Sequence, residues 1–101
     1  MELAGYQRRA LRAAAHGLQP LVQVGKDGLA ENVLKSVREA LAAHELIKVR
    51  FVDEKERRRE IAAELADAVD AALAGVVGHV AILYRPHPEE DKRRVQLPQR
   101  D

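Results

Sequence analysis

The sequence predicts one α/β domain in which helices pack on a mixed four-stranded sheet. The chain has 101 residues, the size of one domain rather than two. Apolar residues make up 47% of it, which is enough for a buried core. Helical and strand periodicities alternate in the order α-β-α-β-α-β-β. Strands separated by helices are expected to pair in parallel, and the last two strands to pair antiparallel, with the strand order left open.

The spacing of apolar residues changes from helical to strand-like near the N-terminus, which predicts the first helix and the first strand. Apolar side chains recur at helical spacing over residues 3–16. Gly17 and Pro20 end this helix, because glycine adopts the left-handed cap and proline cannot continue a helix. The short apolar segment 21–24 contains two valines and is typical of a strand.

A second helix and a second strand are expected in the middle of the chain. The helical period returns over residues 29–43, and a strand follows over residues 46–52. Alternation along this strand places Lys48 and Arg50 on the face opposite its apolar side chains. One face of the sheet is therefore expected to carry positive charge.

The second half of the domain is expected to add a helix and a hairpin. Residues 54–70 carry an apolar stripe with a heavily charged opposite face, and Asp53 with Glu56 resembles a capping box at its start. Residues 72–77 and 80–85 read as two strands joined by a tight Gly-His turn. The charged face of the helix alternates arginine with glutamate, so we expect ion pairs within that helix.

The composition changes after residue 86, which divides the chain into a domain over residues 1–86 and a charged, proline-containing tail over residues 87–101. We expect this tail to be mobile. The longest uncharged stretch, residues 71–84, is shorter than the ~20 residues of a membrane span. The chain has no cysteine, which excludes disulfides and thiolate metal sites. A cytoplasmic protein without a metal or other cofactor is the expectation.

Charge is distributed unevenly although its total is near zero. The chain has 17 Lys and Arg against 16 Asp and Glu, a net charge of +1. Residues 1–52 carry a net +3 and residues 53–101 a net −2. This permits a basic face of the kind that nucleic-acid binding uses. Its candidate members are Arg8, Arg9 and Arg12 on the first helix, Lys48 and Arg50 on the second strand, and Arg85 at the end of the last strand.

A Gly-x-x-Gly motif joins the first strand to the second helix, with Lys26 and Asp27 between Gly25 and Gly28. The two glycines allow a sharp turn and let a phosphate backbone approach closely, and the following helix offers free N–H groups. KH modules clamp a nucleotide backbone in this way. The alternative is a strand-to-helix turn that needs glycine for its geometry alone, and Asp27 places a negative charge within the loop.

Residue types that carry catalysis are scarce, so we expect no enzyme. Ser36 is the only serine, and the chain has neither threonine nor cysteine as a nucleophile. The four histidines, at positions 16, 44, 79 and 87, lack the spacing of a metal site and are interpreted as structural. Three aromatic residues are too few to stack several bases; Phe51 is expected in the core, and Tyr6 and Tyr84 at its margin.

Several short motifs occur in a fixed order along the chain. They are LAGYQRRALR at residues 3–12, LQPLVQVGKDGL at 18–29, HELIKV at 44–49, VGH at 77–79 and ILYRP at 82–86. In these motifs the chain resembles the YhbY-like proteins, which are stand-alone bacterial forms of the CRM (chloroplast RNA splicing and ribosome maturation) domain. The resemblance implies an RNA-binding domain similar in fold to the C-terminal domain of translation initiation factor three. It also implies association with precursors of the large ribosomal subunit, without catalysis.

The resemblance implies that the Gly25–Gly28 loop contacts RNA and that the first-helix arginines and the Lys48 strand supply a basic surface. The chain differs from the family pattern at Asp27 and in its third strand, where Ala74 and Gly75 are unusually small. Two functions stay open. The first is binding of ribosomal RNA by a monomer, and the alternative is a protein-interaction module that uses residues 54–70 and the tail.

Overall fold

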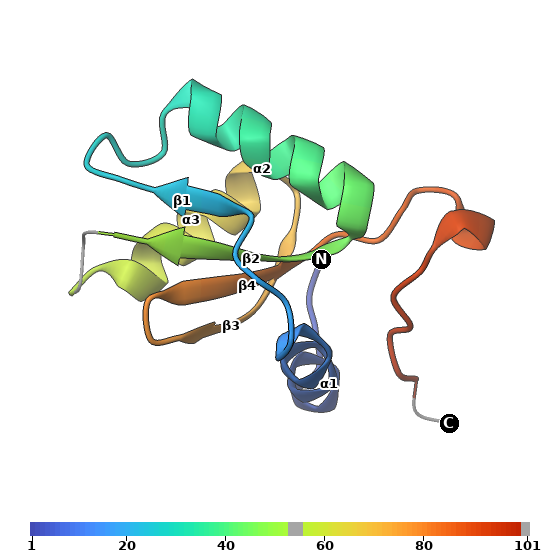
Figure 1. The fold of residues 1–101 in the computed structure, drawn as a ribbon. Helices are drawn as coiled ribbons and strands as arrows, with labels where there is room; N and C mark the ends of the chain where they lie inside the picture. Colours follow the sequence, from blue (N-terminus) through green and yellow to red (C-terminus); the bar gives the residue numbers. More distant parts are fainter. Residues whose placement is uncertain (53–55, 100–101) are drawn as a thin grey trace.

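A four-stranded sheet with helices on both of its faces forms the domain (Figure 1). The computed structural model describes residues 1–52 and 56–99. Within these residues the elements are α1 (Gly5–Ala15), β1 (Val22–Val24), α2 (Glu31–His44), β2 (Leu46–Phe51), α3 (Arg58–Ala68), β3 (Ala72–Val77), β4 (Val80–Tyr84) and the short 3-10 helix η1 (Glu90–Lys92). The predicted α/β class and element order are confirmed. None of these helices has the length and hydropathy needed to cross a membrane.

The strand order in the sheet, which the sequence left open, is β1-β2-β4-β3. The strands β1 and β2 pair in parallel, with α2 as the crossover between them. The hairpin strands β3 and β4 pair antiparallel, as expected. The expected parallel pairing of β2 with β3 across α3 is not observed, because β4 lies between them and pairs antiparallel with β2. Gly78 has a φ of 59° in the hairpin turn, a conformation that glycine adopts at little cost. The sheet is therefore mixed, as predicted.

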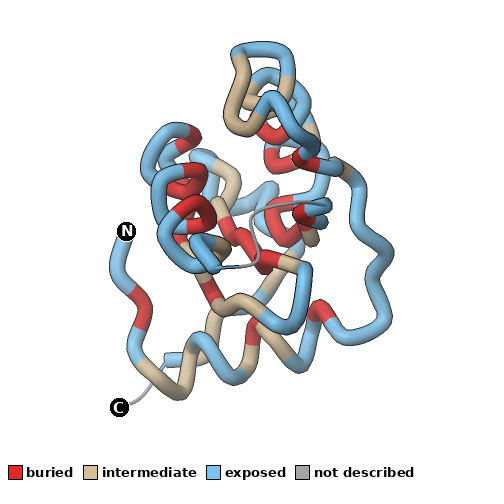
Figure 2. The backbone as a smooth tube through the Cα atoms, turned by 90° about the vertical axis from the view of Figure 1, so that its left-hand side faces the viewer, coloured by how far each residue is buried: buried red, intermediate tan, exposed pale blue. Residues whose placement is uncertain are grey.

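The larger part of the core lies between the sheet and the helices α2 and α3. Val37 and Leu41 of α2 and Leu65 of α3 are fully buried there. They meet the buried face of β2, formed by Ile47, Val49 and Phe51, as the alternation of this strand predicted. Figure 2 shows the buried segments gathered in the interior between exposed outer turns.

A second, smaller core lies on the opposite face of the sheet, under α1. Leu11 and Ala15 of α1 pack there against Ile82 and Tyr84 of β4. Tyr84 is only 2% exposed, so its expected place at the margin of the core was wrong. Burial and the charge of nearby Glu45 both raise the pKa of the Tyr84 hydroxyl, although Arg93 opposes this.

All three α-helices begin later than predicted, and α1 begins at Gly5 instead of residue 3. Ala30 has extended backbone angles, so α2 begins at Glu31 and two residues later than expected. Helix α3 begins at Arg58, after a turn, and so starts later than residue 54. The expected cap at Asp53 lies outside the described residues.

The tail, which was expected to be mobile, has specific contacts with the domain in the structure. Val95 and Leu97 pack against the smaller core. The Gln7 side chain donates a hydrogen bond to the carbonyl of Pro98 over 3.1 Å. The described part of the tail therefore runs beside α1, at the end of the sheet away from the Gly-x-x-Gly loop (Figure 1).

Candidate nucleic-acid interface

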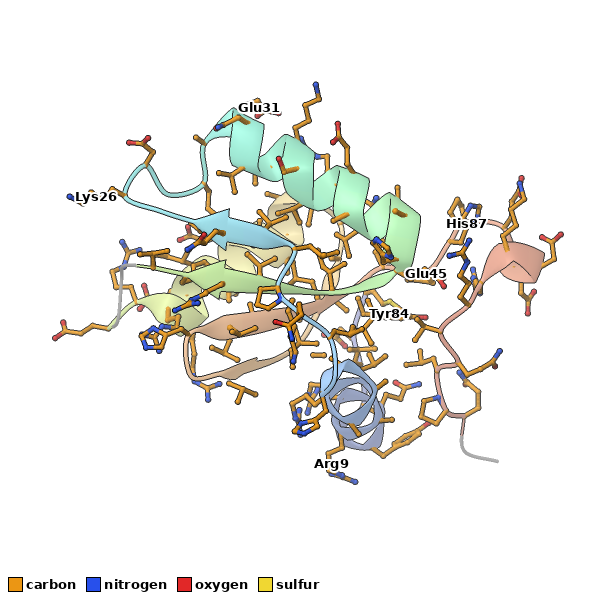
Figure 3. The ribbon with its side chains drawn as sticks, in the orientation of Figure 1. Arg9, Lys26, Glu31, Glu45, Tyr84 and His87 are labelled. Atoms are coloured by element: carbon orange, nitrogen blue, oxygen red, sulfur yellow. The ribbon has the colours of Figure 1, made fainter. Side chains whose placement is uncertain are left out.

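The Gly25–Gly28 loop forms a hydrogen-bonded turn at one end of the sheet. The Gly28 N–H donates to the Gly25 carbonyl over 3.1 Å, and Gly28 has a φ of 64°. A β-branched or larger residue at Gly28 would be strained in this conformation. Lys26 and Asp27 occupy the tip of the turn and are exposed. In Figure 3 the Lys26 side chain points away from the domain.

The start of α2 is a weaker anion site than the sequence indicated. Residues 29–30 separate Gly28, the last glycine of the loop, from the helix, which begins at Glu31. The Glu31 carboxylate places a negative charge in the first turn and pairs with Arg38 over 3.1 Å. Because this carboxylate already faces the positive end of the helix dipole, the contribution of the helix to phosphate binding is reduced.

A groove of about 620 Å³ lies on the sheet face that α1 leaves uncovered. Arg12 of α1 and His16, which directly follows this helix, line one side of it, and Lys48 of β2 lies beside them. Its remaining surface is formed by α1 and the hairpin, through Ala13, Val77, Val80 and Ile82. No Asp or Glu is among the described residues that line this groove. An anionic ligand would therefore meet basic side chains and no carboxylate there.

Lys48 is held in place by the end of α1. Its ammonium group donates to the carbonyls of His16 over 3.2 Å and Leu18 over 3.0 Å. These are carbonyls at or beyond the C-terminus of the helix, where a cation is favourable. Lys48 therefore joins the sheet to α1 as well as contributing charge to the groove.

Arg12 is held in place by the edge strand β3. Its guanidinium donates to the carbonyl of Ala74 over 2.8 Å. The pairing of β3 with β4 shifts between Leu73 and Gly75, which indicates a β-bulge at Ala74. A Cβ atom on Gly75 would lie 2.7 Å from Cδ of Arg12. The small residues that distinguish the third strand from the family pattern therefore make room for this arginine.

Arg50 connects the groove to the loop end of the sheet. It lies two residues beyond Lys48 on the same face of β2 and pairs with Gln23 of β1 and Val80 of β4. Its side chain is exposed. Strand β1 leads directly into the Gly-x-x-Gly loop. Of the two predicted cations on β2, Arg50 is paired closer to this loop than Lys48 is.

The other predicted basic residues differ in exposure and in their hydrogen bonds within the domain. Arg9 is exposed on the outer side of α1 (Figure 3), whereas Arg8 donates to the carbonyl of Leu3. Arg85 donates to the carbonyls of Val69 over 2.9 Å and Arg38 over 3.2 Å. Arg85 therefore links α2 to the end of α3 and is not among the residues that line the groove.

The charged face of α3 contains the ion pairs that its sequence predicted. Arg57 pairs with Glu60 over 3.2 Å and with Glu64 over 3.9 Å. Arg58 donates to the carbonyl of Gly78 in the hairpin turn over 2.6 Å. Both arginines are therefore engaged in contacts within the domain.

The residue that sequence reasoning missed is Glu45, which is buried between α2 and the tail. It is 3% exposed and has a φ of 64°, which is unfavourable for a residue with a side chain. Its carboxylate accepts backbone N–H bonds from His87 over 2.7 Å, Arg94 over 2.5 Å and Val95 over 3.0 Å. Burial acts to raise the pKa of Glu45, but these bonds and the nearby His87 outweigh it and lower the pKa. No sequence signal distinguished this carboxylate from a surface glutamate at a helix end.

Comparisons with known proteins agree with this fold and these motifs. Residues 3–85 match the CRS1 / YhbY (CRM) domain. The Bacillus subtilis protein named "Probable RNA-binding protein YqeI" is 37% identical over 97 residues, covering 95% of this chain and 99% of that protein. The Methanocaldococcus jannaschii protein named "Probable RNA-binding protein MJ0652" is 42% identical over 102 residues, covering 98% of this chain and 75% of that protein.

A solved structure extends the likeness to three dimensions. The solution structure of SAV1595 from Staphylococcus aureus, described as "a putative RNA binding protein", matches with a TM-score of 0.82 and 35% identity. The match covers 96% of this chain and 100% of that one. The resemblance to YhbY-like proteins found in the sequence is thus confirmed, and the chain belongs to the CRS1/YhbY (CRM) domain family.

Proposed function

We propose that this chain is a monomeric, cytoplasmic RNA-binding protein that associates with large-subunit ribosomal RNA or its precursors. The observation that carries the proposal is the groove beside α1, which is lined by Arg12, His16 and Lys48 and by no described carboxylate. Arg50 and the Gly25–Gly28 loop continue this surface toward one end of the sheet. Family membership and the names of the relatives support RNA as the ligand.

Backbone contacts are the mode of recognition that this surface favours. Arg12 uses one guanidinium bond for Ala74, and Lys48 uses two bonds for carbonyls of the chain. A guanidinium has five N–H donors and an ammonium has three, so both side chains keep donors for phosphate oxygens. Lys26 and Arg50 are exposed and make no hydrogen bond or ion pair within the part of the chain that the structure describes, so contact with phosphate breaks none there. Such contacts fix the position and register of an RNA and not its sequence.

The proposal is tested by fluorescence anisotropy with fragments of large-subunit ribosomal RNA over a salt series. Binding should weaken with salt, with a log–log slope near −0.7 for each phosphate neutralised on a single strand. Arg50→Glu and Lys26→Glu should each weaken binding. Arg59→Glu is the matched control, since it makes the same charge change at an exposed position of α3. Equal effects of all three variants, or binding independent of salt, would overturn the proposal.

The protein-interaction alternative gives a different result in the same system. Association with a ribosomal particle that survives nuclease treatment and is lost on substitution in α3 would favour it. The ion pairs of Arg57 with Glu60 and Glu64 already satisfy part of that face. The RNA proposal therefore stands on the groove and the loop, and α3 serves as the control surface.

A further inference from the structure

A second groove lies at the end of the domain away from the Gly-x-x-Gly loop. It has a volume of about 560 Å³, within the ~300–1,000 Å³ range of small-ligand sites. The groove is lined by the tail, the end of α2, the start of β2 and the segment between α1 and β1. None of its lining residues belongs to the loop or to the groove proposed above. Figure 1 shows the tail beside α1, with the loop at the far side of the sheet.

The floor of this second groove is apolar and partly open to solvent. Leu18 and Leu21, in the segment between α1 and β1, are 40% and 54% exposed. Leu46 and Ile47 of β2 lie below them and belong to the buried core. The exposed leucines give the floor of this groove an apolar surface that is available to a ligand.

The rim of the groove is polar and basic. Arg94 and His44 lie on it together with the carboxamides of Gln19 and Gln96. Among the described residues, none of these four side chains makes a hydrogen bond or an ion pair. No described Asp or Glu lines the groove. The rim thus offers hydrogen-bond donors, and positive charge from Arg94, to an anionic ligand.

The wall that carries Arg94 is fixed by the buried Glu45 carboxylate. Its Oε1 accepts the backbone N–H groups of both Arg94 and Val95, and its Oε2 accepts that of His87. Glu45 itself directly follows α2, the helix that supplies His44 to the rim. The backbone of the tail at Arg94 is therefore held against the end of α2 by hydrogen bonds to a buried carboxylate, which favours a preorganised rim. Figure 3 shows Glu45, Tyr84 and His87 at this end of the sheet.

We propose that this groove is a second RNA contact that binds one unstacked nucleotide. The base lies on the floor formed by Leu18 and Leu21, and its phosphate lies against Arg94 and His44. The carboxamides of Gln19 and Gln96 both donate and accept, as the polar edge of a base requires. A nucleotide combines a flat, weakly solvated part with a nearby negative charge, which is the chemistry that this floor and rim complement. The inference rests on the proposed function and adds a site to it.

The experiment is a titration of the whole chain with the single-stranded tetranucleotide rA4, followed by ¹H–¹³C methyl spectra. Leu18 and Leu21 should shift and saturate with rA4, and a tetramer of abasic ribose phosphate should not shift them. Arg94→Glu should weaken this response about tenfold, as expected for one lost charge-assisted hydrogen bond. Lys35→Glu is the matched control, at an exposed position of α2 outside the groove. Gln96→Ala, a smaller change, should weaken it less.

The outcomes separate this site from the proposed function. Shifts confined to the Lys26 loop and the Arg12–Lys48 groove would overturn the second site and leave RNA binding in place. Equal responses to rA4 and to the abasic tetramer would also overturn it, because a base would then not be recognised. Stronger methyl shifts with a Glu-Leu repeat hexapeptide than with rA4 would overturn it in favour of an acidic protein partner. Methyl shifts that survive Lys26→Glu and are lost in Arg94→Glu would support it.

Discussion

The replacement Glu45→Gln tests how the domain holds its C-terminal segment. The two carboxylate oxygens accept three backbone N–H bonds, from His87, Arg94 and Val95. A carboxamide of the same shape has one oxygen and one NH₂ group. In either orientation of the amide, at least one backbone N–H would face another donor. The substitution therefore removes the charge and one acceptor with almost no change in volume.

The expected cost follows from the burial of this group. A hydrogen bond to a charged group contributes about 1.5–3 kcal/mol, and Glu45 is 3% exposed, so solvent screens it little. Loss of one such bond should lower the free energy of unfolding by about 2 kcal/mol. Because tail amides that detach can be hydrated, the loss should not approach the sum of three bonds. The matched control is Glu39→Gln, at an exposed position of α2, the helix that precedes Glu45, with an expected change within about 0.5 kcal/mol.

Acid should remove the difference between wild type and variant. The pKa of Glu45 is lowered in the folded protein, so its stabilising contribution is complete above the pKa of the unfolded state. It is lost as the pH falls through the lower, folded-state pKa, where the wild-type carboxylate becomes protonated. Urea unfolding followed by circular dichroism at neutral and at acid pH measures both values. Hydrogen exchange of the amides of His87, Arg94 and Val95 should be faster in the variant at neutral pH.

Two results would refute this reasoning. One is an unfolding free energy for Glu45→Gln equal to that of Glu39→Gln, which would mean that the tail contact adds no stability. The other is a difference from wild type that persists unchanged in acid. Unchanged exchange of the three tail amides would further show that Glu45 does not hold them.

Three further predictions concern the cations. Gly75→Ala should displace Arg12, whose Cδ lies where the new Cβ would clash, and weaken RNA binding several-fold in anisotropy; unchanged affinity would contradict the role of Arg12. Arg85→Ala should lower the unfolding free energy by about 1–3 kcal/mol in urea while leaving RNA affinity unchanged, and the reverse pattern would return Arg85 to the binding surface. Arg50→Gln should make the salt dependence shallower by about 0.7 in log–log slope, whereas a parallel line would exclude a phosphate contact.

The order of helices and strands was largely predictable, because it depends on the spacing of apolar residues and on the glycine and proline residues that end each element. The strands β2 and β3 were placed within a residue of their observed ends, and α2 within two. The strand order was not predictable in this way. After α3, strand β3 lies one strand position away from β2, and β4 then takes the position between them. This arrangement depends on how α2 and α3 pack together on one face of the sheet. Periodicity within a segment carries no information about that packing.

The candidate site was predictable only where a side chain's direction follows from its own strand. Alternation along β2 correctly placed Lys48 and Arg50 on the face opposite the main core. It could not show that Lys48 binds carbonyls at the end of α1, or that Arg85 spans two helix ends. The contacts of the tail were not predictable for the same reason. The glutamate that binds the tail lies 42 residues before His87 in the chain, and the composition of the tail is typical of a mobile segment.

The basic residues can be ranked by the donors that the fold leaves free. Arg85 is partly buried and shares its guanidinium between two backbone carbonyls, so an RNA phosphate would compete with the structure for it. Lys48 has two of its three donors engaged, and Arg12 one of five. Lys26 and Arg50 are exposed and, among the described residues, have no hydrogen bond or ion pair. Charge reversal at Lys26 or Arg50 should therefore reduce affinity without loss of stability, whereas at Arg12 and Lys48 both should fall together. A chain with net charge +1 can present a binding surface in this way, because affinity depends on which cations remain available and not on their total.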